Sequence, residues 1–428
     1  MKITSAAITT ILYPLMVLVV GGTHAVQGEE LSTPATNLRR SLNSLKSPKS
    51  AKASKSPKSA KASKSPKTSK VSKSPKSAKA SKSPFKKASA LLEIDLNVFG
   101  EVHPAKMDIG PDGKLYFTGG TDSRAYRGDI EGNFEMFAEI TTGAGFTLGC
   151  QFDSAGNYYM VNGAGVYMVP AASIMDADAM LPIEPEMFYA WTTEPAIPMS
   201  IDIDNNTGMA YVTDMGKGEI WRIDTATREG AIWASSTQPG YELLYGESDS
   251  TNFLGVPFGA VEVMVDGGSN WLYFSAHERN YFGRIKIMEN GDAGSLQVLA
   301  TVENRATLNG AFLLDVRNNK FYGATPFLNF QNGVDREPKA TRGGEIWMLD
   351  LDDVDEDGNG GEAVRVWQDL DYGTLTDVIT GYGFGDEEDL YLLDGSFDML
   401  QWPTGVVPDP DAPYHGAVRK LKGKSHRK

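Results

Sequence analysis

Histidine, aspartate and asparagine residues stand at corresponding points of several predicted strand pairs. His103, Asn309 and Asp377 stand where a first strand is expected to begin, and Asp214 and His277 where a second strand ends. Side chains of these types can act as general acids and bases, or hold a metal, when they meet at one point. Alternatively, they cap their own turns or face water, as polar groups at strand ends commonly do. Both interpretations stay open from the sequence.

A second acidic group has the spacing of a calcium loop. Asp353, Asp355 and Asp357 alternate and precede Gly358, and alternate carboxylates surround the ion in such loops. The twelfth position is Val364 instead of the glutamate of an EF-hand. Calcium is therefore the one cofactor that the sequence suggests, and a solvated acidic hairpin is the alternative.

Two further residue types bear on modification and redox chemistry. Asn205 opens the only N-glycosylation sequon and lies in a predicted turn, where a glycan could be accommodated. Cys150 is the single cysteine, which excludes an internal disulfide framework and any multi-cysteine zinc site. We expect it to be a small apolar core residue.

A repeat must position these residues. Each unit is an apolar strand, a turn rich in Gly, Asp or Asn, and a strand with a central tyrosine. The six tyrosines are Tyr116, Tyr159, Tyr211, Tyr273, Tyr322 and Tyr391. A third short strand follows each unit, and residues 397–402 offer it in the last one. With no sustained helical period, the pattern predicts an all-β six-bladed propeller over residues 91–402.

In a propeller, first strands begin and second strands end on the same face, so the candidate catalytic residues are expected at one rim. The last unit lacks an obvious fourth strand before the Pro-rich, then basic, tail of residues 403–428. The strand Leu91–Phe99, just ahead of the first unit, is expected to pair there and close the ring.

The chain divides into two parts of opposite charge. Residues 1–90 carry 18 Lys and Arg against two acids, and the remaining residues carry 23 against 53. The formal net charge of -14 hides this segregation. A body so acidic excludes nucleic acid as its partner, and any polyanion must meet the N-terminal part.

The first 25 residues have the form of a secretory signal peptide. Lys2 precedes an apolar run from Ile8 to Val20, and small residues up to Ala25 suit cleavage. This run is shorter than the roughly 20 residues that span a bilayer, and no other segment is long enough. The sequence therefore predicts a secreted protein of the extracellular space or cell wall, with no membrane span.

Residues 26–90 form a basic arm built from a nine-residue repeat, Lys-Ser-Pro-Lys-Ser-Ala-Lys-Ala-Ser. Lysine occupies every third position from Lys46 to Lys82. With almost no large apolar residues, the arm is expected to be disordered. A soluble lysine-rich linker is the alternative interpretation of this composition. Five Ser-Pro pairs are phosphorylation candidates: Ser47, Ser56, Ser65, Ser74 and Ser83.

The arm resembles the Lys-x-x-Lys clusters of silaffins, the secreted silica-precipitating proteins of diatoms. The resemblance covers residues 39–87 and includes the Arg39-Arg40-Ser41-Leu42 stretch, which is similar to their processing region. It implies polyamine modification of the lysines, phosphorylation of the serines and a silica or polyanionic matrix partner.

The repeated body resembles the SMP-30/gluconolactonase/strictosidine synthase-like superfamily, through elements such as Asp-Gly-Lys-Leu-Tyr116 and Gly-Met-Ala-Tyr211-Val-Thr-Asp. The resemblance implies a divalent metal with oxygen ligands at the centre of the propeller. The matching positions are Val102, Met199 and Phe258, none of which can bind a hard cation. The sequence thus puts the metal, and with it lactonase activity, in doubt.

Three classes of function follow from these patterns. The first is a secreted, matrix- or silica-associated binding protein with a small-molecule or sugar ligand at the propeller centre. The second is an extracellular lactonase- or esterase-type hydrolase, and the third is an inert secreted scaffold. Several aromatic residues could stack on a sugar, but core packing is the default expectation for them: Trp191, Trp221, Trp271, Trp347 and Phe258.

Overall fold

The structure, a computed structural model, describes residues 89–95, 103–120, 122–142, 145–176, 180–193, 195, 197–246, 258–276, 279–302, 312–315, 318–325, 344–369, 375–381, 386–395 and 415–422. The chain divides into two units, Met1–Ser81 and Lys82–Lys428, and all the described residues belong to the second. The expected signal peptide and basic arm, including the five candidate phosphorylation serines, lie outside the described residues.

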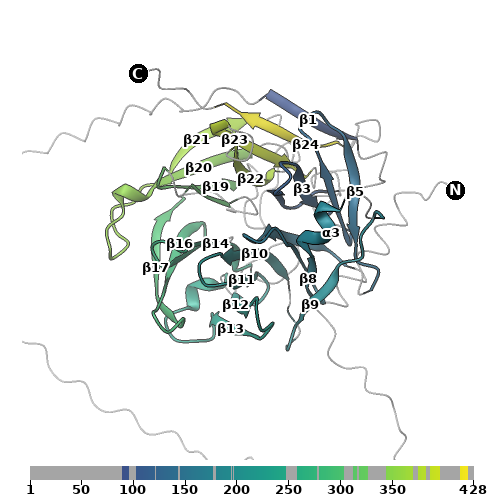
Figure 1. The fold of residues 1–428 in the computed structure, drawn as a ribbon. Coiled ribbons are helices and arrows are strands. Elements are labelled where there is room, and N and C mark those ends of the chain that lie inside the picture. Colours follow the sequence, from purple (N-terminus) through teal and green to yellow (C-terminus); the bar gives the residue numbers. More distant parts are fainter. Residues whose placement is uncertain are drawn as a thin grey trace, which may run out of the picture. The chain divides into compact units, whose positions relative to one another are not determined.

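The described chain forms six antiparallel sheets of four strands each, which confirms the six-bladed propeller (Figure 1). Blades one to three contain the strands β2 (Met107–Ile109), β3 (Leu115–Thr118), β4 (Arg124–Gly128) and β5 (Phe134–Glu139); β6 (Thr147–Phe152), β7 (Tyr158–Asn162), β8 (Gly165–Val169) and β9 (Glu186–Ala190); and β10 (Pro198–Asp204), β11 (Met209–Asp214), β12 (Glu219–Asp224) and β13 (Gly230–Ser235).

Blades four to six follow the same order, with the first strand innermost. They contain β14 (Ala260–Asp266), β15 (Trp271–Ala276), β16 (Tyr281–Ile287) and β17 (Ala293–Thr301); β18 (Phe312–Asp315), β19 (Lys320–Thr325), β20 (Gly344–Asp350) and β21 (Val364–Asp369); and β22 (Leu375–Gly381), β23 (Asp386–Asp394), β24 (His415–Leu421) and β1 (Ser89–Asp95).

The last blade joins the two ends of the propeller sequence, as expected. Strand β1 pairs antiparallel with β24, with Ile94 opposite Gly416, and supplies the outermost strand. The third strand of this blade is β24, within the segment expected to be a tail, so the propeller continues beyond residue 402 to Leu421. The expected third strand at residues 397–402 lies outside the described residues. The prediction of a tail over residues 403–428 is therefore wrong for His415–Leu421, where a short strand follows a segment rich in proline.

Local sequence explains the tight turns between first and second strands. In five blades this turn contains a residue with positive φ, a conformation that glycine and asparagine tolerate best. These residues are Gly113, Gly156, Gly208, Asn270 and Asn319, with φ between 51° and 84°. The Gly, Asp and Asn turn signals of the sequence thus mark real hairpins.

A separate hydrophobic cluster fills each of the six junctions between neighbouring blades. Each cluster contains the repeated tyrosine of one blade, packed against the next blade. Tyr116, for example, packs at the junction of blades one and two, and Tyr391 packs at the junction of blades six and one. The tyrosine repeat therefore encodes contacts between blades, and burial of these large rings stabilises the ring of sheets.

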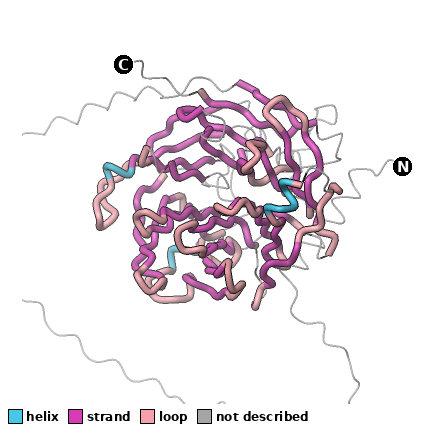
Figure 2. Tube along the Cα trace, viewed as in Figure 1, coloured by secondary structure: helices cyan, strands magenta, loops and turns pink. Residues whose placement is uncertain are grey.

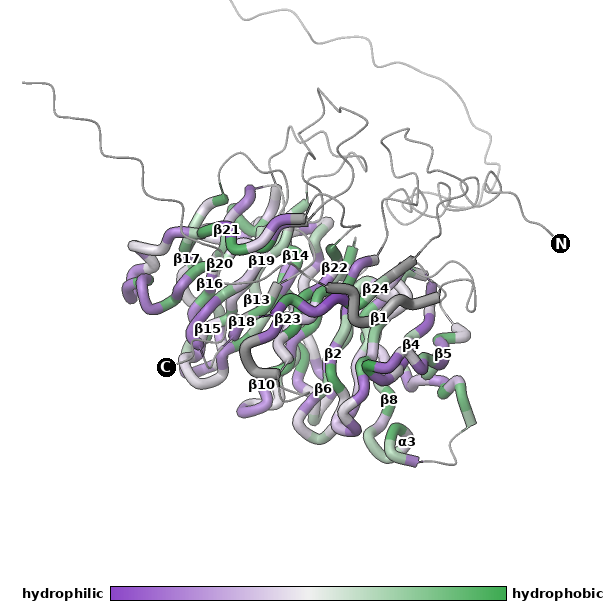
Figure 3. The backbone as a smooth tube through the Cα atoms, turned by 90° about the horizontal axis from the view of Figure 1, so that it is seen from above, coloured by the Kyte–Doolittle hydropathy of each residue, from purple (hydrophilic) through white to green (hydrophobic). Residues whose placement is uncertain are grey.

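Exposure changes from the centre of each sheet to its outer edge. Strands β3, β7 and β8 are buried throughout, whereas the outermost strands β9 and β17 contain exposed as well as buried residues. Hydrophobic (green) and hydrophilic (purple) stretches both occur along the strands (Figure 3). Helical segments are short: α3 (Ala171–Met175), η1 (Glu242–Leu244) and η2 (Leu351–Asp353) (Figure 2). Within the described residues, no helix has the length and apolar character needed to cross a membrane.

Candidate functional site: a buried ion-pair cluster at the propeller centre

A lysine and two acids from three blades meet where the innermost strands converge. The Nζ atom of Lys106, at the start of blade one, lies 2.7 Å from Glu262 Oε1 of blade four and 3.0 Å from Asp377 Oδ1 of blade six. Lys106, Glu262 and Asp377 are only 6%, 3% and 4% exposed. Blades one and four are three positions apart in a ring of six, so Lys106 bridges the centre. We call these three residues the central cluster.

The innermost strands of blades two and three pack tightly against each other. Gly149 of β6 approaches β10 so closely that a Cβ atom there would lie 2.9 Å from the carbonyl oxygen of Met199. Any larger residue would therefore force the two inner strands apart.

Inner-strand carboxylates also join neighbouring blades. Asp377 Oδ2 accepts a hydrogen bond of 2.8 Å from Met107 N in blade one. Asp108 of blade one accepts one of 2.8 Å from Phe152 N in blade two, and Asp202 of blade three accepts one of 2.5 Å from Val265 N in blade four. The innermost strand is a sheet edge whose N–H groups need partners. These three carboxylates supply them.

Burial changes the protonation of this region. Desolvation raises the pKa of Glu262, Asp108 and Asp202 to about 7 each, although Lys106 opposes the shift of Glu262. Desolvation also raises the pKa of Asp377. Burial alone would lower the pKa of Lys106, but the charges of Asp377 and Glu262 outweigh it and raise that pKa.

These states limit the chemistry of the centre. A lysine with a raised pKa stays protonated near neutral pH, so Lys106 is unsuited to act as a nucleophile. Glu262, with its pKa near 7 and a hydrogen bond to the Ser200 side chain, has the proton affinity of a general acid or base. However, Glu262 and Ser200 are 3% and 5% exposed, so a substrate could reach them only after the cluster opens.

Two of the predicted catalytic residues lie at the seam between blades six and one. His103 is 1% exposed, and its Nδ1 lies 3.1 Å from the Gly395 carbonyl oxygen of blade six. Asp377 belongs to the central cluster. Beside them, the Thr376 hydroxyl donates a hydrogen bond of 2.9 Å to the Pro104 carbonyl oxygen. Both residues therefore help to close the ring.

The structure describes one further predicted catalytic residue, Asp214. Asp214 is buried in blade three, where its Oδ1 accepts hydrogen bonds from Ile197 N at 2.8 Å and Gly216 N at 3.1 Å. This is the turn-capping role. Asn309 and His277 lie outside the described residues.

Sequence analysis missed Lys106, Glu262, Asp108 and Asp202, although a signal was present. In four inner strands, a single acid is flanked on both sides by apolar or β-branched residues. The four segments are Met-Asp108-Ile, Ile-Asp202-Ile, Val-Glu262-Val and Thr-Asp377-Val. A charge within an otherwise apolar strand is unusual, because burying it requires a partner. That pattern, compared between repeats, could have identified the centre.

The positions that correspond to lactonase metal ligands are apolar and pack together. Phe258 is 3% exposed and forms a small cluster with Met215 and Val261, against which Met199 also packs. Val102 lies outside the described residues. Neither Met199 nor Phe258 offers an oxygen ligand, so the residues present do not fit the divalent metal of that superfamily.

The candidate calcium loop is an exposed turn between η2 and β21. The Asp355 carboxylate accepts a hydrogen bond of 2.7 Å from Asn359 N, and this contact lowers its pKa. The Arg284 guanidinium donates to the carbonyl oxygens of Asp355 and Glu356 at 2.8 Å and 3.2 Å. Nowhere in the described part of the chain do three or more His, Cys, Asp or Glu side chains form a group that could hold a metal; Asp353, Asp355 and Asp357 are among the residues searched.

The candidate glycosylation residue is on the surface, whereas two of the candidate sugar-stacking tryptophans pack against protein side chains. Asn205 is exposed in the turn after β10, and its Oδ1 accepts a hydrogen bond of 2.8 Å from Ser154 N. Glycosylation there stays a prediction. Among the aromatic residues, Trp221 is fully buried between blades two and three, and the Trp271 ring lies under the Arg284 guanidinium at 4.0 Å. Core packing thus accounts for both rings.

No family model matches this chain, and no curated protein is similar to it in sequence. Among solved structures, a luciferin-regenerating enzyme is 10% identical with a TM-score of 0.51, over 78% of this chain and 95% of that one. A gluconolactonase from Xanthomonas campestris is 10% identical with a TM-score of 0.47, over 76% and 86%. An auxiliary nutrient-binding protein from Bacteroides ovatus is 13% identical with a TM-score of 0.46, over 75% and 69%. At these identities, the similarity to the luciferin-regenerating enzyme establishes the fold alone.

Proposed function

We propose that this protein is a secreted binding protein of silica or a polyanionic extracellular matrix, in which a polycationic arm attaches an acidic propeller to the surface. The segregation of charge carries the proposal: 18 Lys and Arg against two acids in residues 1–90, followed by a strongly acidic body. A surface that repels the propeller can still attract the arm, because exposed charges more than a Debye length apart are largely independent.

The regularity of the arm supports a polyanion as its partner. Recurrent proline biases such a chain toward polyproline II, with three residues per turn at about 3.1 Å rise. Lysines at every third position would then line one edge about 9 Å apart. Phosphorylation of Ser47, Ser56, Ser65, Ser74 and Ser83 and polyamine modification of the lysines, as the silaffin resemblance implies, would make the arm zwitterionic.

The centre of the propeller disfavours catalysis, which favours attachment through the arm as the function. Its carboxylates are buried and engaged with Lys106 or with backbone N–H groups, and the positions for a lactonase metal are apolar. This arrangement holds blades together and gives a rigid body for the arm to carry.

Retention on silica particles tests the proposal. The full chain is compared with a deletion of residues 46–87, a variant with all arm lysines changed to glutamine, and a variant with the arm residues scrambled. We expect retention near 0.1 M salt to be lost in the first two variants and to weaken in the full chain near 1 M, where the screening length falls from about 10 Å to about 3 Å. The scrambled arm keeps the charge of the arm but removes the three-residue spacing of its lysines, so it tests whether that spacing contributes to retention. Unchanged retention after deletion at low salt would refute the proposal.

The second candidate is an extracellular lactonase- or esterase-type hydrolase, and the pKa of about 7 at Glu262 favours it. Such a carboxyl is suited to general acid–base catalysis. Hydrolysis of aliphatic lactones and nitrophenyl esters by the full chain, with and without EDTA, tests this candidate. Turnover that Glu262→Gln abolishes in a folded protein would place the hydrolase first; we expect none.

A further inference from the structure

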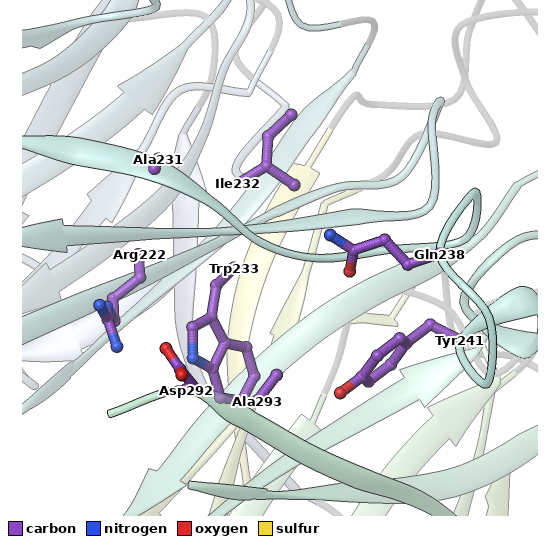
Figure 4. A pocket seen from close by; sticks show the side chains of 8 residues that line it. All are labelled: Arg222, Ala231, Ile232, Trp233, Gln238, Tyr241, Asp292 and Ala293. Carbon is purple, nitrogen blue, oxygen red and sulfur yellow. The ribbon is translucent and has the colours of Figure 1, made fainter. Parts of the chain in front are cut away.

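A cavity of about 360 Å³ lies away from the centre, between the outer parts of blades three and four. Arg222 of β12 and Trp233 of β13 line one side, Gln238 and Tyr241 come from the segment after β13, and Asp292 comes from the β16–β17 hairpin (Figure 4). Three small or branched apolar residues complete its lining. This volume is near the lower end of the range for small-molecule sites, about 300 to 1,000 Å³.

The aromatic side of the cavity is held in place by one hairpin. The Trp233 Nε1–H group donates a hydrogen bond of 2.8 Å to the Gly291 carbonyl oxygen, and Arg222 Nη1 donates to the same atom. The Tyr241 hydroxyl donates a hydrogen bond of 2.5 Å to the Gly294 carbonyl oxygen. Because three segments of blade three are bonded to the β16–β17 hairpin of blade four, the cavity is preorganised, which lowers the ordering cost of binding.

Polar groups at the cavity still have capacity for a ligand. Arg222 is half-buried and has five N–H donors, of which the Gly291 bond uses one. Gln238 is exposed and accepts a hydrogen bond from Ser235 N through Oε1, a contact that does not use the two N–H donors of its NH₂ group. Asp292 is exposed and accepts from Asn290 Nδ2 through Oδ2, so its carboxylate retains acceptor sites.

We propose that this cavity binds one neutral sugar ring. Arg222 and Asp292 bring one charge of each sign, so the cavity has no net charge with which to select an ion, and the acidic body disfavours anions. Donors and acceptors arranged beside the Trp233 and Tyr241 rings suit a ligand with hydroxyl groups around an apolar ring face. This site is independent of the arm and of the proposed attachment to silica, and it is separate from the central cluster.

Titration of the full chain with methyl glycosides of glucose, galactose, mannose and xylose, followed by calorimetry and saturation-transfer NMR, tests the site. Glucuronate and glycine serve as an anionic and a zwitterionic probe. A ligand of about twelve heavy atoms is expected to bind in about the millimolar range. Asp292→Ala and Gln238→Ala should each weaken binding, Asp292→Ala by about tenfold, because a hydrogen bond to a charged group is lost.

Asp129→Ala is the matched control. Asp129 is a partly exposed aspartate in the corresponding β4–β5 hairpin of blade one, bonded to Asn133 much as Asp292 is bonded to Asn290. It should bind sugar like the unchanged protein. Absence of saturable binding by any of the four glycosides, equal weakening by the control, or saturation by glucuronate or glycine alone would each overturn the proposal. Circular dichroism of each variant verifies that the propeller is folded.

Discussion

Lys106 of blade one and Glu262 of blade four form an ion pair of 2.7 Å at the buried centre of the propeller. Two blades lie between them on either side of the ring, and Asp377 of blade six completes the cluster at 3.0 Å from the same ammonium group. The Lys106–Glu262 contact couples two blades that share no sheet and no hydrophobic junction.

Lys106→Met should destabilise the propeller strongly. It leaves Glu262 and Asp377 buried without their counter-ion, and breaking a buried pair in this way costs about 3–5 kcal/mol. Urea unfolding of the variant measures the free energy directly. Lys320→Met is the matched control, because Lys320 pairs with Asp350 at 2.5 Å but is 29% exposed, and such pairs contribute about 0–1 kcal/mol. Equal losses in the two variants would contradict this role of the central cluster.

Stability should fall as pH rises toward neutrality. The pKa of Asp202 is raised from 3.8 to about 7 in the folded protein, so between these values the native state holds a proton that the unfolded chain has released. Each such group lowers the free energy of unfolding by up to about 1.4 kcal/mol per pH unit over that window. Asp108 and Glu262 act in the same direction. The melting temperature should therefore be higher at pH 5 than at pH 7.

Asp202→Asn isolates one of these groups. Its neighbours include Asp108 and Asp204, whose charges also disfavour ionisation of Asp202. The variant should show a shallower fall in stability between pH 5 and pH 7. Asp129→Asn should keep the original slope, because contacts with Asn133 lower the pKa of that exposed carboxylate and move its titration below the window. A slope unchanged in Asp202→Asn would exclude Asp202 as a contributor.

Equivalent hydroxyls in blades three and four should differ in importance. Thr213 Oγ1 donates a hydrogen bond of 2.6 Å to the Val261 carbonyl oxygen and accepts one of 3.2 Å from Ser200 N. Ser275 occupies the equivalent position of blade four, because each of the two residues lies two positions after the repeated tyrosine of its blade. The Ser275 Oγ atom has no hydrogen-bond partner in the described part of the chain. Thr213→Val should cost about 1–3 kcal/mol, and Ser275→Ala should be neutral or stabilising. Denaturant unfolding of the two variants measures the change in the free energy of unfolding for each.

Millimolar calcium, the range of extracellular calcium sites, should not change the melting temperature through the Asp353–Asp357 turn. The Arg284 guanidinium already engages the carbonyl oxygens of Asp355 and Glu356, and Asn359 engages the Asp355 carboxylate. Thermal unfolding with calcium and with EDTA is the measurement. A calcium-dependent rise that Asp355→Asn removes would establish the loop as a calcium site.

Sequence alone determined the architecture of this protein. The repeated tyrosine cores with Gly, Asp and Asn turns predicted six blades, and the unassigned strand ahead of the first core predicted closure of the ring. Such signals are local, because the period of a strand and the φ preference of a turn residue are properties of a few adjacent positions. The segregation of charge between arm and body is likewise a property of the sequence itself.

Only the tertiary structure decided which polar residues meet. Lys106, Glu262 and Asp377 are far apart in the chain, and their contact depends on the blade count, the register of each inner strand and the position of β24. Asp214 caps a turn of blade three, and His103 contacts the Gly395 carbonyl oxygen at the seam between blades six and one. The sequence is compatible with both roles but does not distinguish them from other roles of strand-end polar residues. The cavity beside Trp233 likewise depends on how blades three and four pack, because long-range packing places side chains from separate blades around one space.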